Sequence, residues 1–317
     1  MEKGTFAMRF KKIPEKIKNW FKWLFTTRKG QKNLWGLLFI IPAITIFIIF
    51  TVVPIGMSFA LSLTNMKGLK LGNLDYVGLK NFRYIFKVDP MFWKAMKNIG
   101  LYTVITVPLT LTSSLILAVI IKKQIFGTKF FRGLFYLPGI TSGVATAMVW
   151  LYLLNGNGII NNGIRWFNKV FNASMPLILM NDSRSAIWGL ILMTLWGGLG
   201  GNMVLFLAGM NAIPPTLYEA AQIDGANRVQ SFFRITLHLL KPSLIFALTL
   251  SLIGSPQMFE PILIMDANTT TPVYEIYKNA MHGGLGTGLA TAQSIVLFVF
   301  IMLITMVMQR VNKEYRL

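Results

Sequence analysis

Polar side chains interrupt two strongly apolar segments of the chain, at about residues 186–211 and 242–265. A polar group at membrane depth is costly unless it is paired or functional, so these side chains are candidates for contact with a solute. Amides, hydroxyls and aromatic faces suit a sugar, which presents hydroxyls and apolar ring faces. The candidates are Thr194, Trp196, Gly198, Gly201 and Asn202 in the first segment, and Ser251, Ser255, Gln257, Phe259 and Glu260 in the second. For each residue the alternative is helix packing, above all for the glycines.

The same sequence offers little for catalysis. It has no cysteine, which excludes disulfides, thiolate metal sites and cysteine nucleophiles. Its two histidines, His238 and His282, are predicted on opposite sides of a membrane, where they share neither a metal nor a proton relay. There is no Gly-x-x-x-x-Gly-Lys-Ser/Thr motif, and Gly284, Gly286 and Gly288 follow no predicted strand, so we interpret them as helix entry or close packing. We therefore expect a chain that is not an enzyme and binds no cofactor or metal.

Composition indicates a membrane protein. Of the 317 residues, 54% are hydrophobic and 13% are charged, and the mean hydropathy is +0.57. A soluble domain usually carries about 25% charged residues. Six apolar segments approach the ~20 residues that a spanning helix needs. They lie at about 35–62, 98–121, 133–154, 186–211, 242–265 and 287–309. The sequence thus predicts an all-α polytopic membrane protein with about six transmembrane helices.

The distribution of basic residues predicts the orientation. The net charge is +20, and the Lys and Arg residues flank the apolar segments, which favours membrane topology over nucleic-acid binding. If the N-terminus is cytoplasmic, the inner segments hold 20 of the 31 Lys and Arg residues and the longer outer loops hold 11. Those inner segments are 1–33, 122–132, 212–241 and 310–317. Both termini are therefore predicted to be cytoplasmic.

The N-terminal region is predicted to be distinct from the spans. Residues 1–33 are basic, and Ile13, Ile17, Trp20 and Leu24 recur there at helical spacing. This pattern predicts an amphipathic helix on an anionic leaflet, and the alternative is a disordered basic tail. The polar stretch is unlike a cleavable signal peptide, so we expect the first span to remain as an anchor. The transmembrane domain is expected to occupy residues 34–317.

A polar loop at 212–242 joins the fourth and fifth spans. Thr216 and Glu219 have capping-box spacing, which predicts a short helix beginning at Leu217. Gly225 suits the left-handed residue that ends such a helix, and Pro242 suits the first turn of the fifth span. A second helix is expected to carry Val229, Phe232, Phe233 and Leu237 toward the bilayer. The loop is thus predicted to be a helix-turn-helix in the cytosol, with an ordinary interhelical connection as the alternative.

The loop resembles the EAA loop of binding-protein-dependent ABC permeases. The residues that carry the resemblance are Glu219, Ala220 and Ala221, then Asp224, Gly225 and Ala226, then Ile235 and Leu237. In that family the loop is a coupling helix that docks into a groove on the ATPase subunit. The resemblance therefore implies that Glu219–Ala221 and Asp224–Ala226 couple this chain to an ATPase. One departure is His238, which stands where the family usually has proline.

Four further stretches resemble the carbohydrate branch of that family, the group similar to maltose and multiple-sugar permease subunits. They are Tyr76–Phe82, Arg132–Pro138, Gly156–Asn161 and Met203–Gly209. Together with the loop, the resemblance covers roughly residues 34–312. It implies a type I importer bundle in the bacterial plasma membrane. The Gly-Gly-Pro run often seen in the last outer loop is absent, and that loop reads Met265 to Pro272.

The resemblance also implies partners. We expect a second, similar permease, in a heterodimer or alternatively a homodimer, and two ATP-binding subunits that hold ATP and magnesium and hydrolyse the nucleotide. We also expect an extracytoplasmic solute-binding protein and a carbohydrate substrate. One alternative is an importer of another solute, such as glycerol-phosphate or an amino acid. Another is a membrane enzyme or a static scaffold, and the lack of a polar catalytic cluster disfavours the enzyme.

Overall fold

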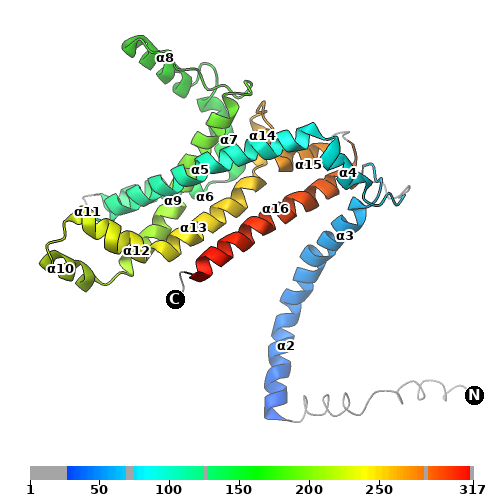
Figure 1. Cartoon of the computed structure of the whole chain (residues 1–317), viewed down its shortest axis with the longest axis horizontal. Coiled ribbons are helices and arrows are strands. Elements are labelled where there is room, and N and C mark those ends of the chain that lie inside the picture. The colour runs from blue at the N-terminus through cyan, green and yellow to red at the C-terminus, as the bar shows by residue number, and fades with distance from the viewer. Residues whose placement is uncertain (1–26, 69–74, 124–126, 282–284, 315–317) are drawn as a thin grey trace, which may run out of the picture. The chain divides into compact units, whose positions relative to one another are not determined.

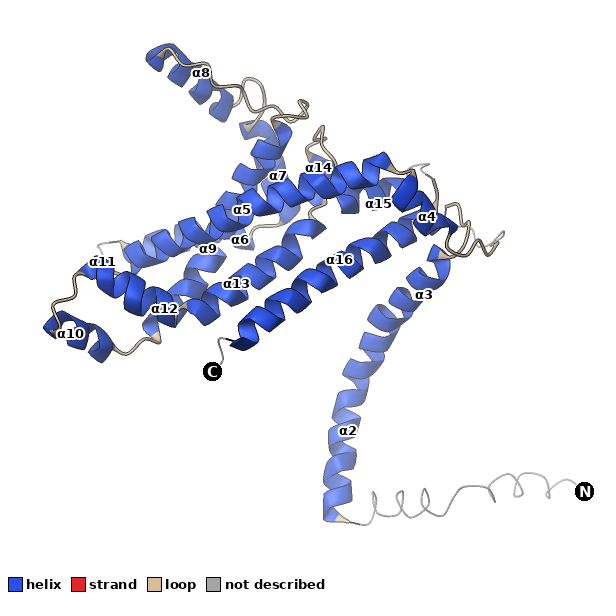
Figure 2. Ribbon diagram, in the orientation of Figure 1, coloured by secondary structure: helices blue, strands red, loops and turns tan. Residues whose placement is uncertain are grey.

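The computed structural model describes residues 27–68, 75–123, 127–281 and 285–314, and they are almost entirely helical (Figures 1 and 2). Within these residues no β-strand occurs, and one isolated bridge pairs Thr64 with Tyr76. The α-helices are α2 (Arg28–Phe47), α3 (Val53–Ser62), α4 (Lys80–Lys87), α5 (Pro90–Lys122), α6 (Thr128–Ile140), α7 (Gly143–Leu153), α8 (Ile159–Phe171), α9 (Ala186–Asn211), α10 (Pro215–Ile223), α11 (Arg228–Ser231), α12 (Leu237–Leu239), α13 (Lys241–Gly254), α14 (Glu260–Ile264), α15 (Pro272–Met281) and α16 (Thr287–Glu314). The chain divides into two units, Met1–Ala60 and Leu61–Leu317.

The described part of the first unit holds one candidate span, which ends two residues past the unit at Ser62. Its helices α2 and α3 are joined by a π-helical turn, η2 (Ile48–Val52), and together give 28 spanning residues from Trp35 to Ser62. The π turn precedes Pro54, which has no backbone N–H to donate. The Val53 N–H bonds the carbonyl of Ile48, five residues back, so the proline is accommodated without ending the helix. The predicted first span is confirmed, and the predicted N-terminal amphipathic helix lies outside the described residues.

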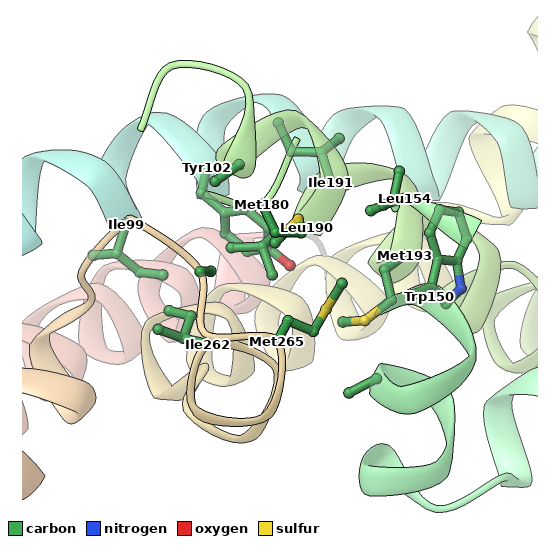
Figure 3. Close-up of a cluster of buried hydrophobic side chains, with 13 residues drawn as sticks. Ile99, Tyr102, Trp150, Leu154, Met180, Leu190, Ile191, Met193, Ile262 and Met265 are labelled. Carbon is green, nitrogen blue, oxygen red and sulfur yellow. The ribbon is translucent and has the colours of Figure 1, made fainter. Parts of the chain in front are cut away.

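The second unit is a bundle of long helices. Figure 3 shows one of its buried hydrophobic clusters, where side chains of α5, α7, α9 and α14 meet. The cluster includes Tyr102 of α5, Trp150 of α7, Leu190 of α9 and Ile262 of α14. A second cluster joins α5, α9 and α13 through residues such as Phe206, which is fully buried. These clusters fix α5 against α9, and the two helices form the frame on which the other elements pack.

Two predicted spans match the structure closely and one was too short. The fourth prediction agrees with α9, and the sixth agrees with the apolar stretch Thr287–Arg310 of α16. The second span was predicted at 98–121, but α5 begins at Pro90 and has 33 residues. A helix of that length extends about 50 Å, well beyond a ~30 Å hydrocarbon core. The earlier start has a local cause, because Asp89 caps the helix and Pro90 occupies its first turn.

The other two predicted spans are broken. The third, predicted at 133–154, consists of α6 and α7, which meet at an angle of 101°. Pro138 lies in the last turn of α6, and Thr141 and Ser142 are extended, so the helical bonds stop there. The fifth, predicted at 242–265, consists of α13, a 3₁₀ turn η4 (Ser255–Gln257) and α14. By length and composition the described residues hold five candidate spans, or six when the bent α6–α7 pair is counted as one.

A buried polar chain ties α5 to the last two helices. Asp89 accepts hydrogen bonds from the backbone N–H groups of Met91 (3.1 Å) and Phe92 (3.0 Å) through Oδ1. Its Oδ2 accepts from Gln293 Nε2 of α16 at 2.8 Å, and Gln293 Oε1 accepts from Asn279 Nδ2 of α15 at 3.0 Å. Gln293 is fully buried, so these bonds replace water that has no access.

Replacing Asp89 with alanine is therefore expected to lower the free energy of unfolding by about 2–4 kcal/mol. About 1 kcal/mol comes from the lost cap, and about 1–3 kcal/mol comes from the Gln293 amide left without its acceptor. The measurement is the unfolding midpoint of the detergent-purified chain. Asp89→Asn keeps a capping oxygen and is expected to fall between the two, and an alanine variant as stable as wild type would contradict the structural role.

Close packing explains two glycines at the start of α16, Gly286 just before the helix and Gly288 in its first turn. A Cβ on Gly286, whose φ is +117°, would lie 2.7 Å from the Met66 carbonyl oxygen. A Cβ on Gly288 would overlap the Thr64 carbonyl oxygen. Both glycines thus allow backbone to approach the start of α16, which confirms the interpretation as close packing. Gly284 and His282 lie outside the described residues.

Candidate functional site

One cavity inside the bundle has a volume of about 610 Å³ and a mixed polar and apolar lining. It lies where α5 and α9 face the broken helix formed by α13, η4 and α14, and Val273 of α15 also lines it. Its polar lining consists of Tyr102, Thr106, Thr110, Thr194, Asn202, Ser251, Ser255, Gln257 and Glu260. Its apolar lining includes Val107, Met258, Phe259 and Pro261. The volume lies in the range of small-molecule sites.

Eight of the ten residues singled out from the sequence line this cavity. They are Thr194, Gly198 and Asn202 of α9, with Ser251, Ser255, Gln257, Phe259 and Glu260 of the broken helix. The other two lie outside its lining. Trp196 packs edge-on against Trp150 at 6.1 Å, and Gly201 is exposed with no atom near the position of a Cβ.

The break in the fifth span presents the polar groups of its segment. Ser255 begins η4, and its Oγ accepts a hydrogen bond from Thr103 Oγ1 of α5 at 2.9 Å. The Gln257 Nε2 donates to the Ile253 carbonyl at 2.8 Å, and Gln257 lines the cavity. Interrupted helices expose backbone and side-chain dipoles that a continuous helix would keep paired. The proline-containing break therefore builds the polar wall of the cavity.

Glu260 begins α14 beside a second break. Its carboxylate lies against Gly143, the first residue of α7, so closely that a Cβ there would overlap Oε2. Gly143 thus leaves room for the acid between the two halves of the bent pair. Phe259, the preceding residue, packs against Tyr277 with ring centroids 5.0 Å apart. The acid and the aromatic ring are consequently held by different neighbours on the same cavity wall.

Sequence reasoning missed the wall contributed by α5. Tyr102 donates through its hydroxyl to Thr194 Oγ1 at 2.7 Å and so bridges α5 to α9. Thr106 and Thr110 follow on the same helical face, and in the described structure their hydroxyl oxygens have no hydrogen-bond partner. The spacing of these three hydroxyls, every fourth residue within an apolar span, is a signal that the sequence does carry.

The polar loop after α9 forms two short helices. Helix α10 ends at Ile223, and Gly225 has a φ of +79°. The N–H of Ala226 bonds the Ala221 carbonyl at 2.8 Å, and the N–H of Gly225 bonds the Gln222 carbonyl at 3.0 Å. These two bonds form a Schellman motif, so the predicted left-handed glycine is confirmed. Ile223 is 87% exposed, which leaves an apolar side chain at the tip of the loop.

The predicted capping box at Thr216 is wrong. Helix α10 begins at Pro215, its cap residue is Pro214, and no side chain caps it. The fixed φ of proline already suits the first helical position, so the helix starts before Thr216. A capping box occurs one helix later, where Asn227 and Gln230 exchange side-chain and backbone hydrogen bonds of 2.9 Å each. The position of Pro242 in the first turn of α13 is confirmed.

The loop is anchored to the bundle through one tyrosine. The Tyr218 hydroxyl of α10 shares a 2.9 Å hydrogen bond with Thr236 Oγ1, and Thr236 is buried. Lys122, at the end of α5, donates to the Met210 carbonyl of α9 at 3.1 Å and lies 5.1 Å from the centre of the Tyr218 ring. These contacts connect α10 to the ends of α5 and α9, which the sequence predicts to lie on the cytoplasmic side. Glu219, Ala220, Asp224 and Gly225 remain exposed.

Comparison with known proteins decides the family. Residues 23–316 match the family described as the binding-protein-dependent transport system inner membrane component. The chain belongs to this family of ABC transporter permeases. The probable ABC transporter permease protein YesP of Bacillus subtilis (strain 168) is 36% identical over 292 residues, which cover 90% of this chain and 92% of YesP. The multiple sugar-binding transport system permease protein MsmF of Streptococcus mutans is 28% identical and covers 92% and 99% respectively.

The fold agrees with the family. A chain of the bacterial alginate ABC transporter, solved with an alginate pentasaccharide-bound periplasmic protein, superposes with a TM-score of 0.76. It is 23% identical and covers 90% of this chain and 96% of that chain. The permease is therefore an all-α, multi-pass protein of the plasma membrane with the fold of an importer subunit. In this family the chain is the membrane component of a transporter, and the cavity between α5, α9 and α13–α14 lies within its spans.

Proposed function

We propose that this permease forms half of the translocation path for a carbohydrate or oligosaccharide in an ATP-driven importer. The observation that carries the proposal is the 610 Å³ cavity, in which hydroxyls, two amides and the ring of Phe259 face one space between spans. Such groups complement the hydroxyls and apolar ring faces of a sugar. The names of relatives such as MsmF, a multiple sugar-binding system permease, support the same substrate class.

The charge of the cavity supports a neutral solute over an anionic one. Its lining holds one ionisable acid, Glu260, and no Lys, Arg or His. In a site of low dielectric a carboxylate repels a phosphate or carboxylate of the solute. For this reason a sugar is favoured over the glycerol-phosphate alternative. The chain itself is proposed to bind no cofactor.

The Glu219–Ala226 segment is proposed to couple the permease to an ATPase subunit. Helix α10 is exposed and ends in a rigid Schellman motif, and Ile223 offers an apolar contact at its tip. Helix α10 is linked to the spans by the contacts of Tyr218 with Thr236 and Lys122. A displacement of α10 by the ATPase would therefore be transmitted through these contacts to the bundle. ATP and magnesium would be held and hydrolysed on two separate ATP-binding subunits.

The remaining partners follow from the same proposal. A second permease, different from this one in a heterodimer or identical in a homodimer, would supply the other half of the path. An extracytoplasmic solute-binding protein would deliver the sugar. Both termini and the 212–242 loop would lie in the cytosol, as the distribution of Lys and Arg predicts.

The cavity is tested by replacing Asn202 with leucine. The change removes one amide from the α9 wall, and sugar uptake at limiting concentration is expected to fall about tenfold, since one such hydrogen bond is worth about 1–1.5 kcal/mol. The matched control is Asn211→Leu, the same change at the exposed end of the same helix and outside the cavity. Uptake is measured with labelled mono- and oligosaccharides and with glycerol-phosphate. Equal uptake of sugars by both variants would contradict the proposed path.

A further inference from the structure

Helix α8 has a strongly amphipathic sequence that the proposed transport function does not use. Five exposed apolar side chains share one side of it, and five polar ones share the other. The apolar side chains are Ile159, Trp166, Phe167, Val170 and Phe171, which are 77%, 62%, 38%, 54% and 62% exposed. The polar ones are Asn161, Asn162, Arg165, Asn168 and Lys169. A clean apolar face on a helix of a folded chain needs something to cover it.

The base of α8 is rigidly fixed. Asn161 is fully buried, and its Nδ2 lies within hydrogen-bond distance of the carbonyls of Leu154 (3.1 Å), Asn155 (3.0 Å) and Ile178 (2.9 Å). Its Oδ1 accepts from the Ile178 N–H at 2.8 Å. The first turn of α8 is thereby held to the end of α7 and to the segment that returns toward α9. The direction of α8 is therefore fixed by these hydrogen bonds.

The returning segment covers the polar side of α8. Asn168 Nδ2 donates to the Met175 carbonyl at 2.8 Å, and the Met175 N–H donates to Asn168 Oδ1 at 2.9 Å. These paired bonds hold the returning segment against the side of α8 that carries Asn161 and Asn168. The apolar side receives no such cover within the described residues, as the exposed fractions of its side chains show.

Location and charge indicate what covers the apolar face. Helix α8 begins at Ile159, shortly after α7 ends at Leu153, so it starts near the level where the bent span leaves the bilayer. Figure 1 shows α8 extending to one side beyond the end of α7. It carries Arg165 and Lys169 and no acidic residue. Tryptophan on the apolar face and cations on the polar face are typical of a helix lying in a phospholipid interface.

We propose that α8 is an interfacial helix that inserts its apolar face among the lipids of the outer leaflet, with Arg165 and Lys169 close to anionic phospholipid phosphates. The outer location rests on the proposed orientation of the chain, whereas the insertion does not. The returning segment also bonds the last outer loop, since Asn268 donates to the carbonyls of Met180 (2.8 Å) and Asn181 (3.0 Å). The lipid-bound helix therefore steadies the outer rim of the bundle.

The absence of cysteine from the natural sequence allows a direct test. Single cysteines replace Val170, on the apolar face, and Arg165, on the polar face, and each carries a nitroxide label. The full chain is reconstituted into vesicles of phosphatidylethanolamine and phosphatidylglycerol. Collisions with oxygen, which concentrates in lipid, and with a water-soluble nickel complex are measured for each label. At position 170 the ratio of oxygen to nickel collisions is expected to be at least several-fold higher than at position 165.

Two outcomes would overturn the proposal. Equal, high nickel accessibility at both positions would place the apolar face in water. Protection of position 170 from both reagents would show that protein covers it, as a second permease would. Replacing the anionic lipid with phosphatidylcholine is expected to reduce the depth of the 170 label in the natural background, and less in the Arg165→Gln/Lys169→Gln background. Neither result depends on uptake, so a failure of the transport proposal remains a separate finding.

Discussion

Replacement of Gly225 with valine is expected to reduce ATP-driven uptake by roughly 5–30-fold while the permease still folds. A Cβ at this position would meet no atom within 4 Å, so the substitution creates no clash. Its effect comes from the φ of +79°, which costs an L residue about 1–2 kcal/mol and a β-branched residue the most. A cost of that size lowers the population of the Schellman loop by a factor of about 5–30. Helix α10, which is proposed to dock on the ATPase subunit, would then no longer end in a fixed turn.

Gly225→Asn is the matched control, because asparagine tolerates the left-handed region far better than valine. It is expected to retain most of the uptake. Both variants are measured for uptake in cells, for co-purification of the ATPase subunit and for the unfolding midpoint. Wild-type uptake and intact assembly with the valine variant would contradict the coupling role of the loop. A shared loss with asparagine would instead indicate that the glycine itself is needed for close approach by the partner.

Long apolar stretches could be predicted from the sequence with little error. The fourth span agrees at both ends with α9, because Ala186–Asn211 is predominantly apolar and two prolines follow it. Helix breaks were not predicted. Proline is tolerated inside spans, as Pro108 of α5 shows, so the prolines at 138, 256 and 261 did not by themselves specify interrupted helices. Whether a freed carbonyl is satisfied depends on neighbouring helices, which local sequence does not reveal.

The candidate cavity could be predicted in part for a similar reason. Polar residues such as Asn202 and Gln257 stand out in an apolar span, and the cost of burying them indicates their importance. Threonines stand out less, because in a helix they commonly bond the carbonyl four residues back, as Thr249 does to Ile245 at 2.7 Å. The wall formed by Thr106 and Thr110 was therefore missed, since only the packing of α5 on α9 distinguishes them from such ordinary threonines.

Two adjacent glycines of α9 are expected to respond oppositely to alanine. A Cβ on Gly200 would overlap the Phe135 carbonyl oxygen and lie 2.7 Å from its carbonyl carbon. These are backbone atoms of α6, which rotation of a side chain does not move aside. Gly200→Ala is therefore expected to lower the free energy of unfolding by about 1–3 kcal/mol, the usual cost of overpacking. At Gly201 a Cβ would meet nothing within 4 Å, and alanine there is expected to raise stability by about 0.5–1 kcal/mol, since helical glycine is entropically unfavourable.

The two alanine variants also distinguish a packing role from a transport role, the two roles that the sequence left open for the glycines. Gly201 lies outside the cavity, so Gly201→Ala is expected to keep wild-type sugar uptake. Gly200→Ala is expected to reduce the yield and the unfolding midpoint of the purified permease, and uptake would fall in proportion to the folded protein. The midpoints are measured by intrinsic fluorescence in detergent. Equal midpoints would contradict the close contact of α6 and α9, whereas a stable Gly201→Ala variant without uptake would place Gly201 on the solute path after all.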